Sequence, residues 1–306
     1  MNISATIVPI FAIIILGWLA RRKGFLPPEF LNPANRLVYH IAIPAMIFNA
    51  LSQTTLSSQF NLLVITLTLI AAFGAYIAAW LAARGMGLPL NQRGTFIQCA
   101  GHGNLGYIGL AVAFYFLGEN GLSRAGIAAG FLMIIQNLLS VIALQTYAQS
   151  ERAEGTMGRL VMKIIANPVI LSAMAGIFFS SLGLEMPLVV RRSLEIISGL
   201  ALPTALLLIG ATLSFKLIRD YLRTVLSVAV IKLVFLPVMG LMLFRVFHLP
   251  ASEYMPALIL LASPTATVAY VMSKEMQGDP GAAVATISAV TLLSAVTFTF
   301  WLHQGA

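Results

Sequence analysis

Long apolar runs separated by short polar breaks constrain the fold of this chain more than any other feature. A helix needs roughly 20 apolar residues to cross a bilayer, and these runs are long enough to do so. The side chains are 59% hydrophobic and only 9% charged. A soluble domain carries about 25% charged residues, because its surface must face water. The sequence therefore predicts an all-α membrane protein.

Ten transmembrane helices are expected, in two halves of five. Their ranges are about 4–20, 34–53, 61–83, 94–117, 122–148, 166–183, 192–214, 222–247, 254–274 and 281–302. We expect 1–148 to form the first repeat, 149–165 a cytoplasmic linker, and 166–306 the second repeat. No basic segment precedes the first run, so it should be retained as a span and not cleaved as a signal peptide.

The basic residues divide unevenly between the two sides of these spans. Thirteen lie by the loops after spans 1, 3, 5, 7 and 9, namely Arg21, Arg22, Lys23, Arg36, Arg84, Arg93, Arg152, Arg159, Lys163, Lys216, Arg219, Arg223 and Lys274. Four lie on the opposite side, namely Arg124, Arg191, Arg192 and Arg245. Cytoplasmic loops of membrane proteins are enriched in Lys and Arg, so both termini are expected outside the cytoplasm.

The same bias accounts for the net charge of +8 without a nucleic-acid partner. The chain has a single cysteine, Cys99, which excludes an intrachain disulfide and a thiolate metal cluster. We expect no cofactor and no catalytic centre.

Glycines and prolines repeat between the halves at a constant offset. Pairs 159 residues apart are Pro9 and Pro168, Gly17 and Gly176, Gly24 and Gly183, Pro28 and Pro187, and Pro44 and Pro203. Further along, the segment 118–121 matches 278–281 at an offset of 160. Because each half has an odd number of spans, the second half must enter the membrane the other way up. Such inverted repeats are typical of secondary transporters.

Two of the predicted spans are interrupted at corresponding places. The fourth has four glycines between Gly101 and Gly109, and the ninth has Pro264 near mid-membrane, opposite Asn104 at the 160 offset. Glycine weakens a helix, and proline removes a backbone donor. The simpler interpretation is close packing and a kink. Because the interruptions are paired, a binding site is favoured, with discontinuous helices 4 and 9 crossing there.

Each interruption exposes a new helix N-terminus, whose free amides attract an anion. The candidate substrate-binding residues are Asn104, His102, Gly103, Gly106, Tyr107, Ser263, Pro264, Thr265, Thr267 and, from span 2, Asn49. The side chains of Asn104, Ser263, Thr265 and Thr267 would add neutral hydrogen bonds. His102 could bind substrate, carry a proton, or form a hydrogen bond with a backbone group that the interruption leaves unpaired.

The charged residues also favour an anionic substrate. All ten carboxylates lie in loops or in the end turns of spans. A cation exchanger would be expected to hold acids at mid-membrane. Lys232, inside span 8, is a possible intramembrane charge. It could act in transport, or its long side chain could only place the ammonium group in a hydrated cavity.

The sequence resembles the auxin efflux carrier family, which includes plant PIN auxin exporters and bacterial malate and malonate carriers. The clearest similarity is the segment Pro264–Glu275, a crossing proline followed by an aromatic-Val pair, a small residue, Lys and Glu. Asn104 followed five residues later by Gly109 is similar to the fourth-span pattern, and the segments Val8–Ile10 and Ile43–Ala45 also resemble family signatures.

This resemblance implies a fold like that of bile-acid symporters and sodium–proton antiporters. It implies a scaffold of helices 1, 2, 6 and 7 and a transport domain of helices 3–5 and 8–10. Carriers of this kind are typically homodimers that move one domain against the other, in an elevator mechanism.

The function we expect is secondary transport of a small organic anion, such as malate, malonate or an auxin-like acid, across a bacterial inner membrane. Coupling to Na⁺ or H⁺ stays open, because carbonyls and hydroxyls can hold sodium with little sequence trace. The alternatives are a cation exchanger or a bile-acid-type symporter of the same fold, and a membrane sensor built on a transporter fold. An intramembrane enzyme is disfavoured, since His102 has no evident nucleophile or acid partner.

Overall fold

The computed structural model describes residues 3–53, 60–148, 168–183 and 185–305. Within these ranges the regular secondary structure is helical, apart from one isolated antiparallel β-bridge between Gly103 and Thr265. The predicted linker 149–165 lies outside the described residues, and so do three of the basic residues used for orientation, Arg152, Arg159 and Lys163.

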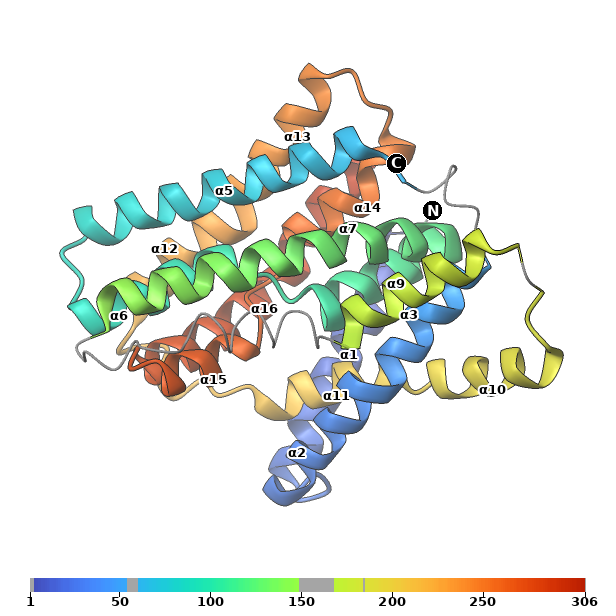
Figure 1. Cartoon of the computed structure of the whole chain (residues 1–306). Helices are drawn as coiled ribbons and strands as arrows, with labels where there is room; N and C mark the ends of the chain where they lie inside the picture. The colour runs from blue at the N-terminus through green and yellow to red at the C-terminus, as the bar shows by residue number, and fades with distance from the viewer. Residues whose placement is uncertain (1–2, 54–59, 149–167, 184, 306) are drawn as a thin grey trace.

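Helices follow one another through both halves of the chain (Figure 1). The first half contains α1 (Ile3–Arg22), α2 (Pro28–Leu37), η1 (Val38–Ala42), α3 (Ile43–Ser52), α5 (Leu62–Gly85), α6 (Leu90–Gly101), η2 (Leu105–Gly109) and α7 (Leu110–Tyr147). The second contains α9 (Pro168–Ser181), α10 (Leu188–Ser198), α11 (Ala201–Thr212), α12 (Leu222–Val230), η3 (Ile231–Phe235), α13 (Leu236–Val246), α14 (Ala251–Ala262), α15 (Val268–Glu275), α16 (Pro280–Leu302) and η4 (His303–Gly305). The elements η1, η2 and η3 are π-helical turns, and η4 is a short 3₁₀ helix.

Six helical stretches are long and apolar enough to cross a membrane, as the composition predicted. They are Ile3–Arg22, Leu62–Gly85, Leu105–Tyr147, Leu188–Thr212, Leu222–Val246 and Pro280–Leu302. Two shorter apolar helices are Pro168–Ser181 and Ala251–Ala262. The chain is thus an all-helical, multi-pass membrane protein, while the number of ten spans stays a prediction.

Several helix boundaries differ from those expected. The helix of predicted span 2 begins at Pro28, because proline fits the first turn of a helix, where no backbone donor is needed. The polar residues of this turn hid the start from a search for apolar runs. Predicted spans 4 and 5 are continuous in α7 except at Gly118, whose φ of 71° interrupts the helix as the break at 118–121 indicated.

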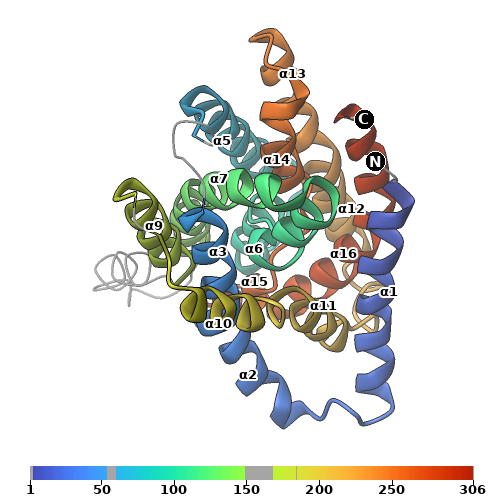
Figure 2. The same cartoon turned by 90° about the vertical axis from the view of Figure 1, so that its right-hand side faces the viewer.

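Figure 2 shows α9, α3, α10, α2, α11 and α1 in an arc, with α5, α6, α7, α12, α13 and α14 gathered on one side of it. Within the arc, α1 packs against α11, and α9 packs against α3. A Cβ atom at Gly17 would lie 2.1 Å from the carbonyl oxygen of Leu207, and one at Gly176 would lie 3.1 Å from that of Phe48. Phe48 and Leu207 have the same 159-residue offset as the two glycines, so one close helix contact occurs twice.

A π-helical turn, η3, widens the helix that contains Lys232. It ends two residues before Pro237, which has no N–H to donate to the carbonyl of Leu233 one turn earlier. The indole nitrogen of Trp301 donates to that carbonyl instead, at 2.9 Å. A side chain of α16 thereby satisfies the backbone that Pro237 frees beside Lys232.

Candidate functional site

The first interruption follows the end of α6 at Gly101. The backbone is extended at His102, with φ −87° and ψ 106°, and regular helix resumes at Leu105. A Cβ atom at Gly101 would lie 2.3 Å from the ring of Tyr76. The glycine therefore lets α5 approach the point at which the helix ends.

The second interruption follows the end of α14 at Ala262. Ser263 is extended, with φ −61° and ψ 140°, because the residue before a proline disfavours the helical region. Regular helix resumes at Val268, the first residue of α15. Proline thus ends this helix, whereas glycines accompany the end of α6.

The two extended segments pair with each other across the centre of the fold. The amide of Asn104 donates to the carbonyl of Pro264 at 2.7 Å, and the amide of Ala266 donates to the carbonyl of His102 at 2.9 Å. These bonds form the bridge between Gly103 and Thr265. The predicted break and meeting of these two helices is confirmed.

Side chains satisfy backbone groups that the breaks release. The carbonyl of Cys99 accepts from the Thr265 hydroxyl at 2.8 Å, and that of Leu261 accepts from the Lys232 ammonium at 3.2 Å. The amide of Gly103 donates to the Gln136 side-chain oxygen at 3.1 Å. Unpaired backbone groups are costly away from water, so these side chains allow irregular backbone at this depth.

A cavity of about 1580 Å³ extends from the crossing to one end of the molecule. Its inner wall includes the segment 102–107, together with Ala266 and Thr267. Other lining residues lie at helix ends, among them Arg21, Arg36, Gln145, Glu275 and Gln277. These ends adjoin the loops after predicted spans 1, 5 and 9, so the cavity opens on the side rich in Lys and Arg.

Asn104 lies on the cavity wall with a side-chain donor that makes no hydrogen bond. Its side-chain oxygen accepts from the amide of Tyr107 at 3.3 Å and so caps the new helix. Its side-chain nitrogen is buried and has no hydrogen-bond partner, and the residue is 5% exposed. A buried donor without an acceptor costs about 1–3 kcal/mol. An acceptor group entering the cavity would recover that free energy.

Gly106 and Tyr107 follow Asn104 on the cavity wall, and both are half-buried. The hydroxyl of Tyr107 donates to the side-chain oxygen of Asn35 on α2 at 3.3 Å. Tyr107 therefore connects the crossing to the arc of helices on the other side of the cavity. At this helix start the amide of Leu105 donates to the carbonyl of Gly103 at 2.9 Å, and that of Tyr107 donates to Asn104. The amide of Gly106 has no such partner in the described structure, so it is the backbone donor here that can bind an acceptor.

His102 belongs to a buried polar network that the sequence did not reveal. Its Nδ1 lies 3.0 Å from the hydroxyl oxygen of Ser140, which lies 2.8 Å from that of Tyr76. The Tyr76 hydroxyl also lies within hydrogen-bond distance of the Gln136 carbonyl. Gln136 and Ser140 are polar residues four apart in an apolar run, a spacing that places both on one helix face. That spacing was the available signal.

The remaining candidate residues divide into two groups. Thr267 lines the cavity, whereas Ser263, Pro264 and Thr265 are buried behind it. The hydroxyl of Ser263 donates to the carbonyl of Ile259 at 3.0 Å, within its own helix. Contact between substrate and these three buried residues stays a prediction.

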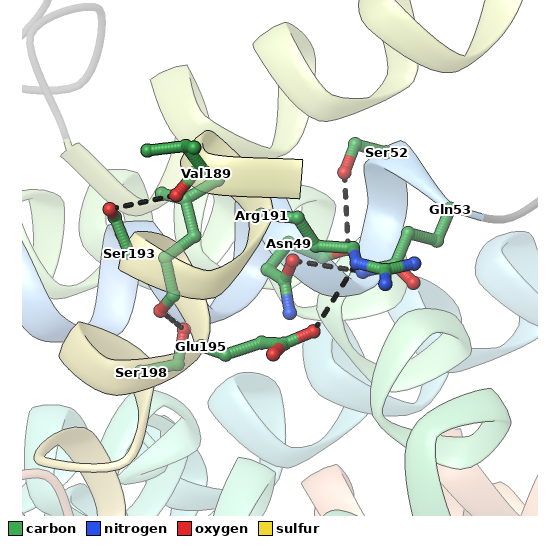
Figure 3. Close-up of polar contacts among 9 residues, drawn as sticks. Asn49, Ser52, Gln53, Val189, Arg191, Ser193, Glu195 and Ser198 are labelled. Carbon is green, nitrogen blue, oxygen red and sulfur yellow. Dashed lines mark hydrogen bonds and ion pairs between the residues drawn. The ribbon is translucent and has the colours of Figure 1, made fainter. Parts of the chain in front are cut away.

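Asn49 does not line the cavity. Its side-chain oxygen accepts from the side chain of Gln53 at 2.8 Å, one turn further along α3. Figure 3 shows this pair next to α10, whose Arg191 and Glu195 form an ion pair at 3.7 Å. The structure therefore brings Asn49 to the neighbourhood of α10 and not to the crossing.

No group of three His, Cys, Asp or Glu side chains that could hold a metal ion is found in the described part of the chain. Lys232 is fully buried at the crossing, where a Cβ atom at Gly103 would lie 3.1 Å from its ammonium nitrogen. Lys232 does not line the cavity, so the groups there that suit an acceptor are neutral donors and the two helix starts.

Proteins of similar sequence carry transporter names. The model of the family described as "Membrane transport protein" matches residues 2–302. A "Putative malonate transporter" of Rhizobium meliloti is 27% identical over 316 residues, covering 99% of this chain and 95% of its own. An "Uncharacterized transporter" of Methanothermobacter thermautotrophicus is 24% identical, covering 98% of both chains. The "Uncharacterized transporter YfdV" of Escherichia coli K12 is 20% identical, covering 97% of this chain and 96% of its own.

The match extends over nearly the whole chain, as the resemblance to auxin efflux carriers did. The chain therefore belongs to the membrane transport protein family, that of the auxin efflux carriers, and is a membrane transporter and not an enzyme.

Proposed function

We propose that this protein is a secondary transporter of a small organic anion, and that a carboxylate binds beside Asn104 at the helix crossing. The observation that carries this proposal is the buried, unpartnered side-chain nitrogen of Asn104 on the cavity wall. A carboxylate is an acceptor-only group, and hydrogen bonds to charged groups are worth about 1.5–3 kcal/mol. The amides that start η2 would add partial positive charge.

Charge along the cavity supports an anion over a cation. Arg21 and Arg36 line its outer part, and such a basic entrance raises the local concentration of anions. The acidic residue on the described wall, Glu275, is the last residue of α15, at the far end of that helix from the crossing. A cation exchanger would need a carboxylate at the crossing itself.

Malonate is the first substrate to test, since the relative from Rhizobium meliloti carries that name. A short dicarboxylate also fits the chemistry of the cavity, with one carboxylate beside Asn104 and the other attracted by the arginines. Malate and auxin-like acids remain candidates of the same class.

Alternating access is the mechanism we propose, with two inverted five-helix repeats and ten spans. The repeated contact of Gly17 with Leu207 and of Gly176 with Phe48 supports the inverted repeat. The arc of helices in Figure 2 matches the proposed scaffold, and the cavity separates the arc from the crossing. With the basic side facing the cytoplasm of a bacterial inner membrane and both termini outside, this conformation is open inward.

Uptake of radiolabelled malonate into proteoliposomes tests the proposal. Liposomes preloaded with unlabelled malonate should accumulate label by exchange, and unlabelled malate and indole acetate should compete according to their fit. Binding measured by thermal shift without any exchange would favour a sensor. Sodium-driven movement of protons, detected with a pH-sensitive dye, would favour the cation exchanger. Either result would overturn anion transport.

A further inference from the structure

Lys232 is the fully buried cationic side chain that the proposed substrate site does not use. It lies in the π-helical turn η3, inside a helix long and apolar enough to cross the membrane. Ionisable residues at such depth are costly and are usually functional. π-helical turns are also frequent at functional sites. Its position therefore requires a physical reason.

The ammonium group lies at the carboxyl end of α14 and close to the segment that follows the carboxyl end of α6. It donates to the carbonyl of Leu261, in the last turn of α14, at 3.2 Å. It also lies beside Gly103, two residues beyond the end of α6. The carboxyl end of a helix carries partial negative charge, so two such ends create a site for a cation. Within the described ranges no ion pair of Lys232 with a carboxylate is found.

The crossing is therefore polarised. The starts of η2 and α15 provide amide donors, whereas the ends of α6 and α14 provide carbonyl acceptors. In secondary transporters, the ends of interrupted helices and unwound carbonyls can hold a coupling sodium ion. Here the Lys232 ammonium lies among such groups, with His102 as the nearby titratable side chain.

We propose that Lys232 is a built-in cation that occupies the place of a coupling sodium ion at the crossing. The chain would then hold its crossing together, and transport its anion, without sodium at this position. This inference rests on the proposed function, because it assigns the coupling of the same site. Lys232 is a positioning residue, since it acts through the helix ends and not on the substrate.

The test measures cation dependence in wild type and in three variants. Detergent-solubilised protein is heated in NaCl, LiCl, NH₄Cl or choline chloride at equal ionic strength. For wild type we expect midpoints that agree within about 1 °C, because no cation binds only the folded state. Lys232→Ala should be less stable in choline and partly restored by Na⁺ or NH₄⁺. Lys232→Met, which fills the space without charge, should be destabilised and show no rescue.

Lys216→Ala is the matched control, since Lys216 is an exposed lysine outside the described helices. It should behave as wild type in every salt. A sodium-dependent midpoint in wild type would overturn the proposal, and so would a Lys232→Met protein as stable as wild type. If no cation restored the stability of Lys232→Ala, Lys232 would stabilise the protein through packing alone, and the proposal would also be overturned.

These readouts require no substrate, so they separate the two proposals. If no anion is exchanged by wild type but the cation pattern holds, the proposed function fails and the role of Lys232 stands. If malonate exchange by wild type requires sodium, the role of Lys232 fails and anion transport stands.

Discussion

The two interrupted helices occupy matching places in the sequence, yet their breaks are built differently. At the break after α6, Asn104 lies on the cavity wall with one side-chain donor unused. At the break after α14, the hydroxyls of Ser263 and Thr265 point into protein and donate to backbone carbonyls. At the first break the side chain of Asn104 therefore offers a donor to the cavity, whereas at the second the side chains of Ser263 and Thr265 hold the crossing together. Residues at matching positions of the two breaks therefore differ in function.

The largest expected effect is that of Asn104→Ala on substrate binding. The substitution removes the donor that we assign to the carboxylate, so affinity for malonate should fall by about 10- to 100-fold. Loss of the helix cap should also cost about 1 kcal/mol of stability. Isothermal titration of malonate into solubilised protein measures the affinity, and a thermal melt measures the stability.

Asn137→Ala provides the matched control for this experiment. Asn137 also lines the cavity, but its side-chain nitrogen already donates to the carbonyl of Met133 at 2.8 Å. Its replacement should change malonate affinity by less than about threefold, since this nitrogen already has an acceptor within the protein. Equal losses in the two variants would remove the special role of Asn104 and the contrast between the breaks.

The sequence predicted the interruptions and their meeting, because both depend on residues with strong local effects. Glycine weakens a helix and proline removes a backbone donor, and a constant offset between the halves shows which interruptions correspond. The orientation of each side chain could not be predicted in this way. Whether Ser263 faces the cavity or its own helix depends on the packing of α14 against α7 and η2, which no single residue determines.

The buried network at His102 was missed for a related reason. Gln136 and Ser140 lie in an apolar run. From the sequence alone, their amide and hydroxyl side chains could equally form ordinary hydrogen bonds between neighbouring helices. Only the position of α7 beside the first break gives them their role. The depth of Lys232 was evident from the sequence, but its partner, the carbonyl of Leu261, becomes available only because Pro264 ends α14.

A smaller effect is expected where the two breaks touch, at Gly109. A Cβ atom there would lie 2.7 Å from the hydroxyl oxygen of Ser263 and 3.0 Å from a methyl carbon of Leu260. Gly109→Ala should therefore lower the stability by about 1–3 kcal/mol through overpacking. A thermal melt of the variant, compared with wild type under identical detergent conditions, measures the loss.

Ser263→Ala distinguishes this contact from general damage. It removes the hydroxyl oxygen that the new methyl group would meet, so Gly109→Ala should cost less in that background than in wild type. Coupling of about 0.5 kcal/mol or more in the double-mutant cycle would show that the breaks touch. Strictly additive losses would mean that the two sites do not contact each other.

The smallest effect, and the one that most directly checks the contrast, is that of Thr265→Val. Valine keeps the shape of threonine but leaves the carbonyl of Cys99 without its donor, which should cost about 1–2 kcal/mol of stability. Malonate affinity should stay within about twofold of wild type, because hydrogen bonds made within the protein contribute equally to the free and bound forms.

Thr267→Val, on the cavity wall, is the counterpart: affinity should fall while stability stays close to wild type. If Thr265→Val weakened binding more than Thr267→Val, the buried residues of the second break would belong to the substrate site, and the contrast between Asn104 and Thr265 would be wrong.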